Sequence, residues 1–365
     1  MTNKIKIALV GCGRISQNHF KSIIYHHKIS TLIAICDTNK EMLNSAQNLI
    51  HQEKIKFNVS DKKPLEYKDF DALLNDVKTK KINIDLVVLA TPSGLHPMQT
   101  ILAAKNKINV CTEKPMAVKY SDGCKMIEVC KENNVKLFVV KQNRFNSTLQ
   151  LLKKQIELER FGKIALVSVN VFWTRPQSYY DQDEWRGTLE LDGGALMNQA
   201  SHYVDLLDWL IGPVESVSAS IATISRNIEA EDTAALKIKW KSGTLGTLGV
   251  TMITYPKNLE GSITILGENG TVKIGGTAVN KIEKWEFKDE NKYDLEVANS
   301  SYENDNVYGK GHYPYYENMI NSIKNDERAI CTGDDGLKSL ELLEASYKSA
   351  IEEKIIKIPL DSNNS

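Results

Sequence analysis

The sequence predicts an α/β protein in which a doubly wound parallel sheet is followed by an α+β domain on a large, mostly antiparallel open sheet. Three observations predict this fold. Short apolar runs alternate with helical patterns over the first 140 residues, and a glycine-rich turn directly follows the first of these runs. Longer strand patterns with alternating or β-branched residues come next. We therefore expect two domains, residues 1–140 and residues 141–365.

In the first domain, each short apolar run is expected to form a buried parallel strand, because helices cover both faces of such a sheet. The helical patterns between the runs supply those helices, and Ser121 is the expected N-cap of one of them. The expected strands are Ile5–Val10, Leu32–Cys36, Ile84–Ala90, Asn109–Thr112 and Leu137–Val140. The expected helices are Arg14–His26, Met42–Ile50, Pro97–Lys105 and Ser121–Asn133.

In the second domain the strand patterns are longer, and Glu268-Asn269-Gly270 between two of them indicates a hairpin. One strong helix is expected to end at Gly212-Pro213, because glycine and proline stop helices. The expected strands are Ile164–Trp173, Ala234–Trp240, Thr244–Thr254, Ile263–Leu266 and Thr271–Ile274. The expected helices are Leu149–Glu159, Ser201–Leu210, Tyr315–Lys324 and Leu337–Glu352.

The composition argues against several classes of protein. Lysine plus arginine and aspartate plus glutamate both number 46, so the formal net charge is +0, which disfavours nucleic acid as the main partner. No apolar run approaches the roughly 20 residues that span a bilayer, and no signal-peptide pattern is seen. The six cysteines form no Cys-x-x-Cys pair, so we expect reduced thiols, no metal site and a cytoplasmic protein.

The segment Gly11-Cys12-Gly13-Arg14-Ile15-Ser16 follows a strand and opens a helix, which is the setting of a dinucleotide-binding turn. Gly11 permits the tight turn, Gly13 lets the backbone approach a pyrophosphate, and Ser16 is small enough to keep helix and strand close. Asp37 ends the second strand, where a carboxylate accepts hydrogen bonds from ribose hydroxyls and repels a 2′-phosphate. Arg14 is a competing signal for a 2′-phosphate, but we weigh Asp37 above it and expect NAD. The alternative for Asp37 is a turn residue or helix cap.

Two further loops follow parallel strands, whose carboxyl ends face the ligand crevice in such a sheet. In Thr91-Pro92-Ser93-Gly94-Leu95-His96-Pro97, the histidine is either a cofactor contact or a cap of the following helix. In Glu113-Lys114-Pro115, the lysine suits the binding and polarisation of a substrate hydroxyl. The alternative for this lysine is a surface Glu-Lys pair.

Paired glycines at 193 and 194 precede a helix that carries Asn198, His202 and Asp205. Asn198 and His202 are four residues apart, so they share a helix face if the helix begins early enough. Histidine titrates near neutral pH, which suits a base that takes a proton from an alcohol. His202 and Asp205 also have a metal-ligand spacing, but a third ligand is missing. The ordinary alternative is a packed or capped helical histidine.

The sequence resembles one family in five segments: GCGRIS, TPSGLHP, EKP, GGALMNQASHYVDLLDWLIG, and the closing helix at Glu344–Ala350. That family is the glucose-fructose oxidoreductase, inositol dehydrogenase and rhizopine-catabolism (Gfo/Idh/MocA) family of NAD(P)-dependent sugar oxidoreductases. The resemblance implies a Rossmann domain, a second α/β domain whose open sheet builds an oligomer, and a catalytic pair, Lys114 and His202. Many members have an aspartate where this sequence has Asn198, so a carboxylate is removed from the site.

A subgroup of that family resembles this sequence more closely, in NVFWTRPQSYYD, EWRGT, MNQASHYVDLLDWLIGPV and TYPKNLEGSITILGE. These segments are similar to the UDP-2-acetamido-2-deoxy-glucuronate 3-dehydrogenases, which oxidise C3 of UDP-N-acetylglucosaminuronic acid (UDP-GlcNAcA). Their 3-keto product is aminated toward diacetamido-uronic acid sugars of lipopolysaccharide and O-antigen. Asn198 belongs to the subgroup's pattern. Some members recycle NADH with 2-oxoglutarate, which is therefore a candidate partner.

The function that this resemblance implies is NAD-dependent oxidation of UDP-GlcNAcA at C3 by a homo-oligomer, either a dimer or a tetramer. The alternatives are a dehydrogenase for another sugar or polyol, such as inositol, and a non-catalytic NAD-binding regulator. The presence of both Lys114 and His202 disfavours the regulator, and the sequence leaves open which of the two is the base. We assign the cofactor to Gly11, Gly13, Arg14, Ile15, Asp37, Thr91, Pro92, Ser93, His96, Glu113, Lys114, Gln142, Trp185 and Arg186. We assign the substrate to Lys114, Arg175, Tyr179, Asn198 and His202, and we leave Trp173 and Tyr180 between stacking and core roles.

Overall fold

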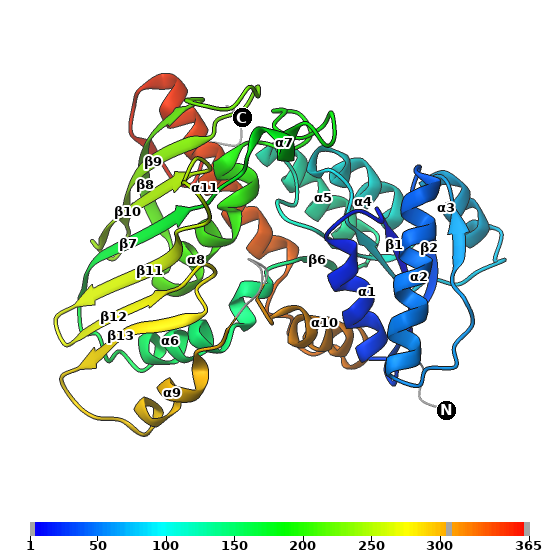
Figure 1. The fold of residues 1–365 in the computed structure, drawn as a ribbon, viewed down its shortest axis with the longest axis horizontal. Helices are drawn as coiled ribbons and strands as arrows, with labels where there is room; N and C mark the ends of the chain where they lie inside the picture. The colour runs from blue at the N-terminus through cyan, green and yellow to red at the C-terminus, as the bar shows by residue number, and fades with distance from the viewer. Residues whose placement is uncertain (1–3, 304–308, 361–365) are drawn as a thin grey trace. The chain divides into compact units, whose positions relative to one another are not determined.

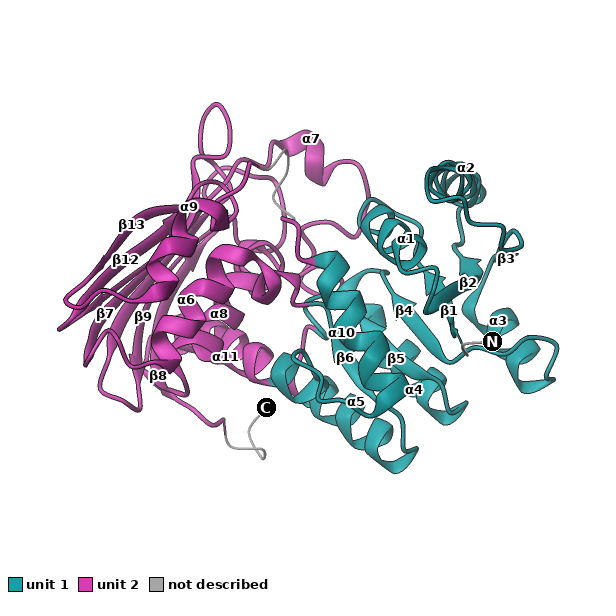
Figure 2. Cartoon of the chain, turned by 90° about the horizontal axis from the view of Figure 1, so that it is seen from below, with its two compact units in different colours: residues 1–117, 121–140, 312–337 teal, residues 118–120, 141–311, 338–365 magenta. Residues whose placement is uncertain are grey.

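The computed structural model describes residues 4–303 and 309–360, and these form two compact units (Figure 2). Unit 1 comprises residues 4–117, 121–140 and 312–337. Unit 2 comprises the other described residues, which include 141–303 and 338–360. Each unit has its own sheet, so the two-part α/β architecture is confirmed.

Unit 1 is built on a six-stranded sheet in the order β3-β2-β1-β4-β5-β6, and every neighbouring pair is parallel (Figure 1). The strand order reverses between β1 and β4, so the carboxyl ends of these strands mark the ligand crevice of such a sheet. The strands are β1 (Ile5–Val10), β2 (Ser30–Cys36), β3 (Leu65–Tyr67), β4 (Leu86–Leu89), β5 (Asn109–Thr112) and β6 (Leu137–Val139). The five expected strands are present, and β3 is an addition.

The helices of unit 1 come from two segments that lie far apart in the sequence, the N-terminal part of the chain and residues 312–337. They are α1 (Ser16–Tyr25), α2 (Lys40–Lys56), α3 (Phe70–Lys78), α4 (His96–Lys105), α5 (Tyr120–Glu132) and α10 (His312–Asn325). Ser121 lies inside α5, one residue after its start, and does not precede the helix as an N-cap. Residues 312–337 belong to unit 1 because they pack there: the Tyr313 ring lies 4.7 Å from that of Tyr25, and Thr332 pairs with Phe138 of β6.

Unit 2 is built on an eight-stranded sheet in the order β13-β12-β11-β7-β10-β9-β8-β14. Neighbouring strands are antiparallel except β7 and β10, which are parallel. The strands are β7 (Ile164–Phe172), β8 (Val214–Ala222), β9 (Thr233–Trp240), β10 (Leu245–Thr251), β11 (Glu260–Gly267), β12 (Gly270–Gly275), β13 (Lys281–Phe287) and β14 (Ile356–Lys357). The mostly antiparallel sheet is confirmed, and β8, β13 and β14 are additions.

The two faces of the eight-stranded sheet differ. Helices α6 (Ser147–Glu157), α8 (Ser201–Ile211) and α11 (Gly333–Glu352) cover one face (Figure 2), and the side chains of β7 that point to that core are fully buried valines. On the other face, Leu166 of β7 pairs in register with Leu245 of β10 and Leu266 of β11. These three leucines are 36% to 53% exposed, so an apolar row crosses the open face.

The described residues also form two short helices and four helical turns. These are α7 (Gln177–Tyr180), α9 (Val297–Ser300), η1 (Ser93–Leu95), η2 (Gln142–Phe145), η3 (Ala195–Gln199) and η4 (Lys292–Glu296). Within the described ranges, no helix is long and apolar enough to cross a membrane. All six cysteines are free thiols, and five of them are buried.

Candidate active site

The turn after β1 fits a dinucleotide, and its two glycines do so for different reasons. Gly11 has a φ of +92°, and a Cβ there would lie 2.5 Å from the carbonyl oxygen of Ala90, so the protein itself requires glycine. A Cβ on Gly13 would meet no atom of the described residues within 4 Å. The space above Gly13, next to the start of α1, is therefore open for the pyrophosphate that this fold binds at that place.

Ser16 stands where the fingerprint has a third small residue. Its side chain is buried, and its hydroxyl donates a hydrogen bond to the carbonyl oxygen of Gly13 at 2.6 Å. The serine thus keeps α1 close to β1 and leaves no hydroxyl unpaired in the core. Arg14 is exposed on the same turn, and Ile15 is half-buried.

Asp37 holds the glycine-rich turn from the end of β2. Its Oδ2 accepts a hydrogen bond from the N–H of Cys12 at 2.7 Å, and its Oδ1 accepts one from the N–H of Asn39 at 2.8 Å. The N-cap of α2 is Asn39, so Asp37 does not cap that helix. Of the two alternatives to a ribose contact, the structure supports the turn residue. A carboxylate has about four acceptor sites, which leaves capacity for ribose hydroxyls beside these two bonds.

His96 ties the loop after β4 to the loop of Lys114. The side chain is fully buried, and its Nε2 lies 3.0 Å from the carbonyl oxygen of Thr91 while its Nδ1 lies 3.1 Å from that of Pro115. Burial lowers the pKa of His96, although both carbonyl oxygens favour the charged ring. The ring nitrogens thus serve the backbone of two loops, and the cofactor contact expected for His96 stays a prediction.

A buried chain of three side chains ends beside Lys114. The Tyr316 hydroxyl lies 2.7 Å from His19 Nδ1, and His19 Nε2 lies 3.1 Å from Glu113 Oε1. Because burial raises the pKa of Tyr316 well above its usual range, the phenol donates, and His19 then donates from Nε2 to the carboxylate. Glu113 Oε2 also accepts the N–H of Lys114 at 3.1 Å.

Glu113 is ionised in this arrangement. Burial alone would raise its pKa, but the hydrogen bond from His19 and the charge of Lys114 outweigh burial and hold the pKa at about 2. An adjacent negative charge favours the charged form of an amine. The half-buried Lys114 side chain is therefore suited to donate hydrogen bonds as an ammonium.

In unit 2, a π-helical turn carries Asn198. The π-helix η3 follows Gly193 and Gly194 and precedes α8, which begins at Ser201. The N–H of Ala200 donates to the carbonyl of Ala195 at 2.9 Å, which is the spacing of a π-helix. The expected single helix is thus two elements, and π-helical turns are frequent at functional sites.

Glu231 caps this π-helical turn. Its Oε1 accepts hydrogen bonds from the N–H of Leu196 at 2.7 Å and from the hydroxyl of Tyr347 at 2.8 Å. The Tyr347 oxygen in turn accepts the N–H of Met197 at 3.2 Å. A Cβ on Gly194 would lie 2.1 Å from the Glu231 carboxylate, so glycine is required there. Burial raises the pKa of Glu231 to about 7.

His202 lies in the first turn of α8 and is buried. Its Nε2 lies 3.0 Å from Nε2 of Gln142 in η2. An amide nitrogen only donates, so the ring Nε2 accepts and the ring proton sits on Nδ1. A neutral imidazole is the form that can take up a proton. The assignment of Gln142 to the cofactor stays a prediction beside this contact with His202.

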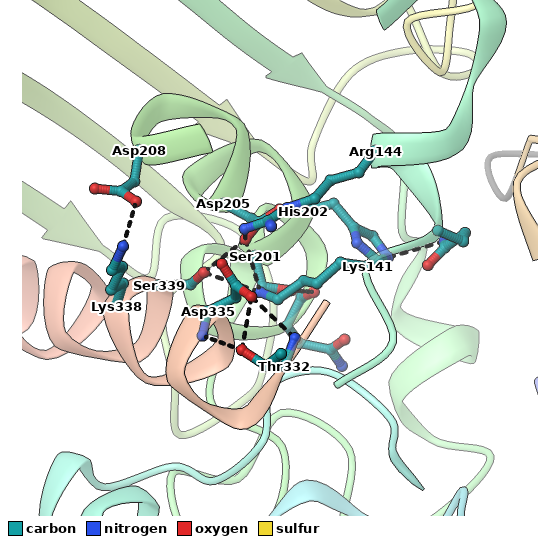
Figure 3. A network of polar contacts seen from close by, with 12 residues as sticks. Lys141, Arg144, Ser201, His202, Asp205, Asp208, Thr332, Asp335, Lys338 and Ser339 are labelled. Atoms are coloured by element: carbon teal, nitrogen blue, oxygen red, sulfur yellow. Dashed lines mark hydrogen bonds and ion pairs between the residues drawn. The ribbon is translucent and has the colours of Figure 1, made fainter. Parts of the chain in front are cut away.

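Asp205 is held by cations, which excludes the metal-ligand interpretation of the His202–Asp205 spacing (Figure 3). Arg144 donates to both carboxylate oxygens of Asp205, at 2.8 and 2.7 Å, and Ser339 donates to one at 2.9 Å. Lys141 Nζ lies 3.6 Å from the same oxygen. All four side chains are buried. Burial works against the charge, but Arg144 and Lys141 hold the pKa of Asp205 far below its usual range.

The described part of the chain contains no group of three or more His, Cys, Asp and Glu side chains that could hold a metal ion.

A cationic aromatic cluster contains four residues that the sequence assigned to ligands. The guanidinium groups of Arg175 and Arg186 lie 5.5 and 4.5 Å from the ring centre of Tyr179, and Arg186 lies 4.8 Å from the Trp185 ring. Gln199 accepts from Arg175 Nε at 3.1 Å and donates to the Tyr179 hydroxyl at 3.3 Å. Two guanidinium groups around one ring suit the binding of an anion.

The two aromatic residues that were left open are part of the core. Trp173 is 3% exposed, and its indole N–H donates to the carbonyl of Thr277 at 3.0 Å. Tyr180 is 6% exposed and packs on Tyr179 with ring centres 5.1 Å apart. Of the two interpretations, the structure supports packing for both.

Sequence reasoning missed the residues that hold these site segments in place. They are His19 and Tyr316 in unit 1, and Lys141, Arg144, Asp192, Gln199, Glu231, Ser339 and Tyr347 in unit 2. The one available signal was the segment Gln142-Asn143-Arg144, because it follows β6 at the same edge as the other candidate loops.

Two family models together match most of the chain. The model of an oxidoreductase family NAD-binding Rossmann fold matches residues 5–141, and the model of the C-terminal alpha/beta domain of that family matches residues 153–360. The chain belongs to the Gfo/Idh/MocA oxidoreductase family. Membership confirms the predicted NAD-binding Rossmann domain and the class of enzyme.

Two solved structures are similar to this family member over nearly its whole length. The WlbA dehydrogenase from Chromobacterium violaceum, in complex with NADH and UDP-GlcNAcA, is 49% identical, with 99% of this chain and 98% of that chain covered and a TM-score of 0.90. The WlbA dehydrogenase from Bordetella pertussis, with the same two ligands, is 49% identical over 99% and 100% of the chains, with a TM-score of 0.89. The myo-inositol 2-dehydrogenase of Thermotoga maritima is 24% identical over 97% of this chain and 98% of that protein.

The two glycines of the nucleotide turn should respond differently to the same substitution. Gly11→Ala puts a methyl group against the Ala90 carbonyl in a strained backbone conformation, so we expect a loss of about 3 kcal/mol in the free energy of unfolding. Gly13→Ala meets no protein atom, so its stability should stay within about 1 kcal/mol of the wild type while its affinity for NADH falls. Urea unfolding and NADH fluorescence titration measure the two effects. Equal NADH affinity in Gly13→Ala and wild type would contradict the assignment of the space above Gly13 to the pyrophosphate.

Glu231 should make stability depend on pH. Its pKa rises from 4.5 in the unfolded chain to about 7 in the folded protein, so the protonated carboxyl stabilises the fold fully below about pH 4.5. That contribution is lost as the pH rises through about 7, and it amounts to roughly 3 kcal/mol. Glu231→Gln keeps an acceptor for Leu196 and Tyr347 and removes the titration. Urea unfolding at about pH 5 and about pH 8 should show a smaller decline in Glu231→Gln than in wild type, and equal declines would refute the account.

Proposed function

We propose that this protein is an NAD-dependent dehydrogenase that oxidises the C3 hydroxyl of UDP-GlcNAcA to the 3-keto sugar. The observation that carries the proposal is 49% identity over 99% of the chain to two dehydrogenases crystallised with NADH and UDP-GlcNAcA. The chain also keeps Lys114 and His202, the catalytic pair that the family resemblance implies. As part of the proposal, the product enters the synthesis of diacetamido-uronic acid sugars of lipopolysaccharide and O-antigen, in the cytoplasm.

The geometry of the turn after β1 is suited to NAD. The space above Gly13 is open, and Asp37 holds the turn with acceptor capacity left for the ribose. We assign the cofactor to this turn, to the loops at 91–96 and 113–114, and to the remaining residues of the sequence-based set, Trp185 and Arg186 among them. When bound, NAD supplies the hydride acceptor of the oxidation.

In the proposed mechanism Lys114 and His202 divide the work on the hydroxyl. His202 takes the hydroxyl proton on Nε2, the basic nitrogen that accepts from Gln142 in the structure, once the substrate hydroxyl replaces the Gln142 amide there and as the C3 hydride departs to NAD. Lys114, kept charged by Glu113, donates a hydrogen bond to the same oxygen and stabilises the negative charge that develops there. The reverse assignment, with Lys114 as the base, is disfavoured by the ionised carboxylate beside it.

The proposed substrate carries a carboxylate and a pyrophosphate. The Arg175 guanidinium lies 5.5 Å from the ring centre of Tyr179, and we assign the negative groups of the substrate to these two residues. We also assign Asn198 to the substrate, as a hydrogen-bonding partner of the sugar ring.

The assay that tests the proposal mixes the protein with UDP-GlcNAcA and NAD and follows the absorbance of NADH with and without 2-oxoglutarate. NADH that accumulates without the oxoacid indicates a free-cofactor dehydrogenase. 3-Keto sugar and 2-hydroxyglutarate that appear only when the oxoacid is added indicate a recycling enzyme. No product in either case would overturn the nucleotide-sugar proposal, and myo-inositol would be the first alternative substrate because of the 24% identical relative.

The two catalytic assignments predict matched defects. Lys114→Ala and His202→Ala should each lower kcat by about a hundredfold or more. NADH binding should be retained, because Lys114 is one of many assigned cofactor contacts and the glycine-rich turn and Asp37 are unchanged. Lys119→Ala and His51→Ala are the controls, since both side chains are exposed and lie outside the assigned site. Stopped-flow and steady-state rates with UDP-GlcNAcA measure the effect. A His202→Ala enzyme with full activity would remove His202 from the mechanism.

The apolar row on the open sheet face supports a homo-oligomer, which we propose to be a tetramer or a dimer. Leu166→Glu combined with Leu245→Glu places charges in that row, and burying them unpaired is costly, so the variant should dissociate. Leu295→Glu is the control, because Leu295 is 82% exposed in η4. Light scattering after size-exclusion chromatography measures the mass. A wild-type mass near 41.0 kDa would contradict the proposal.

A further inference from the structure

Asp192 is in hydrogen-bonding contact with Asn198 and is buried, with 3% of its surface exposed. Its Oδ2 accepts a hydrogen bond from the N–H of Gly187 at 2.7 Å. Its Oδ1 accepts a short hydrogen bond from the side-chain amide nitrogen of Asn198. Neither the sequence motifs nor the catalytic assignment uses this carboxylate.

The backbone around Asp192 fixes its position independently of Asn198. The N–H groups of Asp192 and Gly193 both donate to the carbonyl of Thr188, at 3.2 and 2.8 Å, so residues 188–193 form a closed turn. Asn198 is held from the other side, because its N–H donates to the carbonyl of Gly194 at 3.0 Å within η3. Two rigid backbone segments therefore bring the carboxylate and the amide together.

We propose that Asp192 is a positioning residue that locks the Asn198 side chain so that its amide oxygen serves as a hydrogen-bond acceptor for the substrate. An ionised carboxylate only accepts hydrogen bonds, so the Asn198 atom that faces it is the nitrogen. The amide oxygen then points away from Asp192, on the other branch of the planar group. Asn198, half-buried in the structure, thus presents a defined acceptor to a hydroxyl or an N–H of the sugar. The inference rests on the proposed function of the site.

The charge arrangement explains why position 198 carries an amide. An aspartate at 198 would place two carboxylates in hydrogen-bonding contact, and one of them would have to hold a proton. The asparagine keeps an acceptor oxygen toward the substrate while the negative charge sits one side chain behind it. The pair therefore works as a unit, and changing either member alone should disrupt it.

Single substitutions should impair turnover without abolishing the fold. Asp192→Asn sets an amide nitrogen against either the N–H of Gly187 or the amide of Asn198, and Asn198→Asp sets two carboxylates together. We expect each to lower kcat with UDP-GlcNAcA by about 10-fold to 100-fold, with NADH affinity unchanged. Asp181→Asn is the matched control, because Asp181 is an exposed carboxylate that accepts from Gln177, and its kcat should equal that of the wild type.

The reciprocal exchange is the decisive variant. In Asp192→Asn/Asn198→Asp, the new amide at 192 accepts from Gly187 and donates to the new carboxylate at 198, which still offers an acceptor oxygen to the substrate. We expect kcat to return to within about threefold of the wild type, while KM rises because the carboxylate at 198 repels the anionic substrate. A role limited to stability would lower the free energy of unfolding in the single variants while leaving kcat per folded molecule unchanged, and that result would overturn the inference.

Two other outcomes are equally clear. An exchange variant whose kcat is as low as that of the poorer single variant would overturn the inference while leaving the proposed function intact. A wild-type protein without activity toward UDP-GlcNAcA would overturn the proposed function and this inference together.

Discussion

Buried and half-buried carboxylates hold the segments that carry the candidate site. Glycine-rich turns and helix starts expose backbone N–H groups that have no partner within their own element, and a carboxylate accepts several of them at once. Asp37 accepts two such N–H groups in the turn after β1, whereas Glu231 accepts one in the π-helical turn and Asp192 accepts one in the turn before it. The reactive side chains are thus placed by backbone segments whose shape depends on a few carboxylate acceptors.

The carboxylates differ in how their charge is balanced. Asp205 faces two cations, Arg144 and Lys141, so its negative charge is more than compensated and removing it would leave two buried positive groups. Glu231 faces no cation in its hydrogen bonds with Leu196 and Tyr347, and its pKa accordingly rises to about 7. The first arrangement resists a change of pH, whereas the second makes the π-helical turn sensitive to it.

The parts that could be predicted from the sequence are those with a local pattern. The parallel strands, the glycine-rich turn and Asp37 follow from apolar runs and from residues 11–16 and 37. The residues that hold the site have no such pattern, because Tyr347 lies 116 positions from Glu231 and Ser339 lies 134 from Asp205. Strand β8 was missed because its two faces are both partly exposed and its apolar residues do not alternate cleanly. Residues 312–337 complete unit 1 through packing on α1 and β6. No sequence pattern in that region indicates that it belongs to the first unit.

The asparagine at 198 shows how one site separates two tasks that a carboxylate would combine. A carboxylate there would accept a hydrogen bond from the substrate and would also repel a substrate that is itself an anion. The Asn198 amide nitrogen faces Asp192, so in the proposed arrangement the amide oxygen would contact the substrate while the negative charge lies one side chain farther away. Arg175 and Arg186 around Tyr179 point to the same requirement, since both add positive charge to this unit's ligand cluster. A site for a neutral polyol gains nothing from either arrangement, so the pair of observations favours an anionic sugar over an inositol-like one.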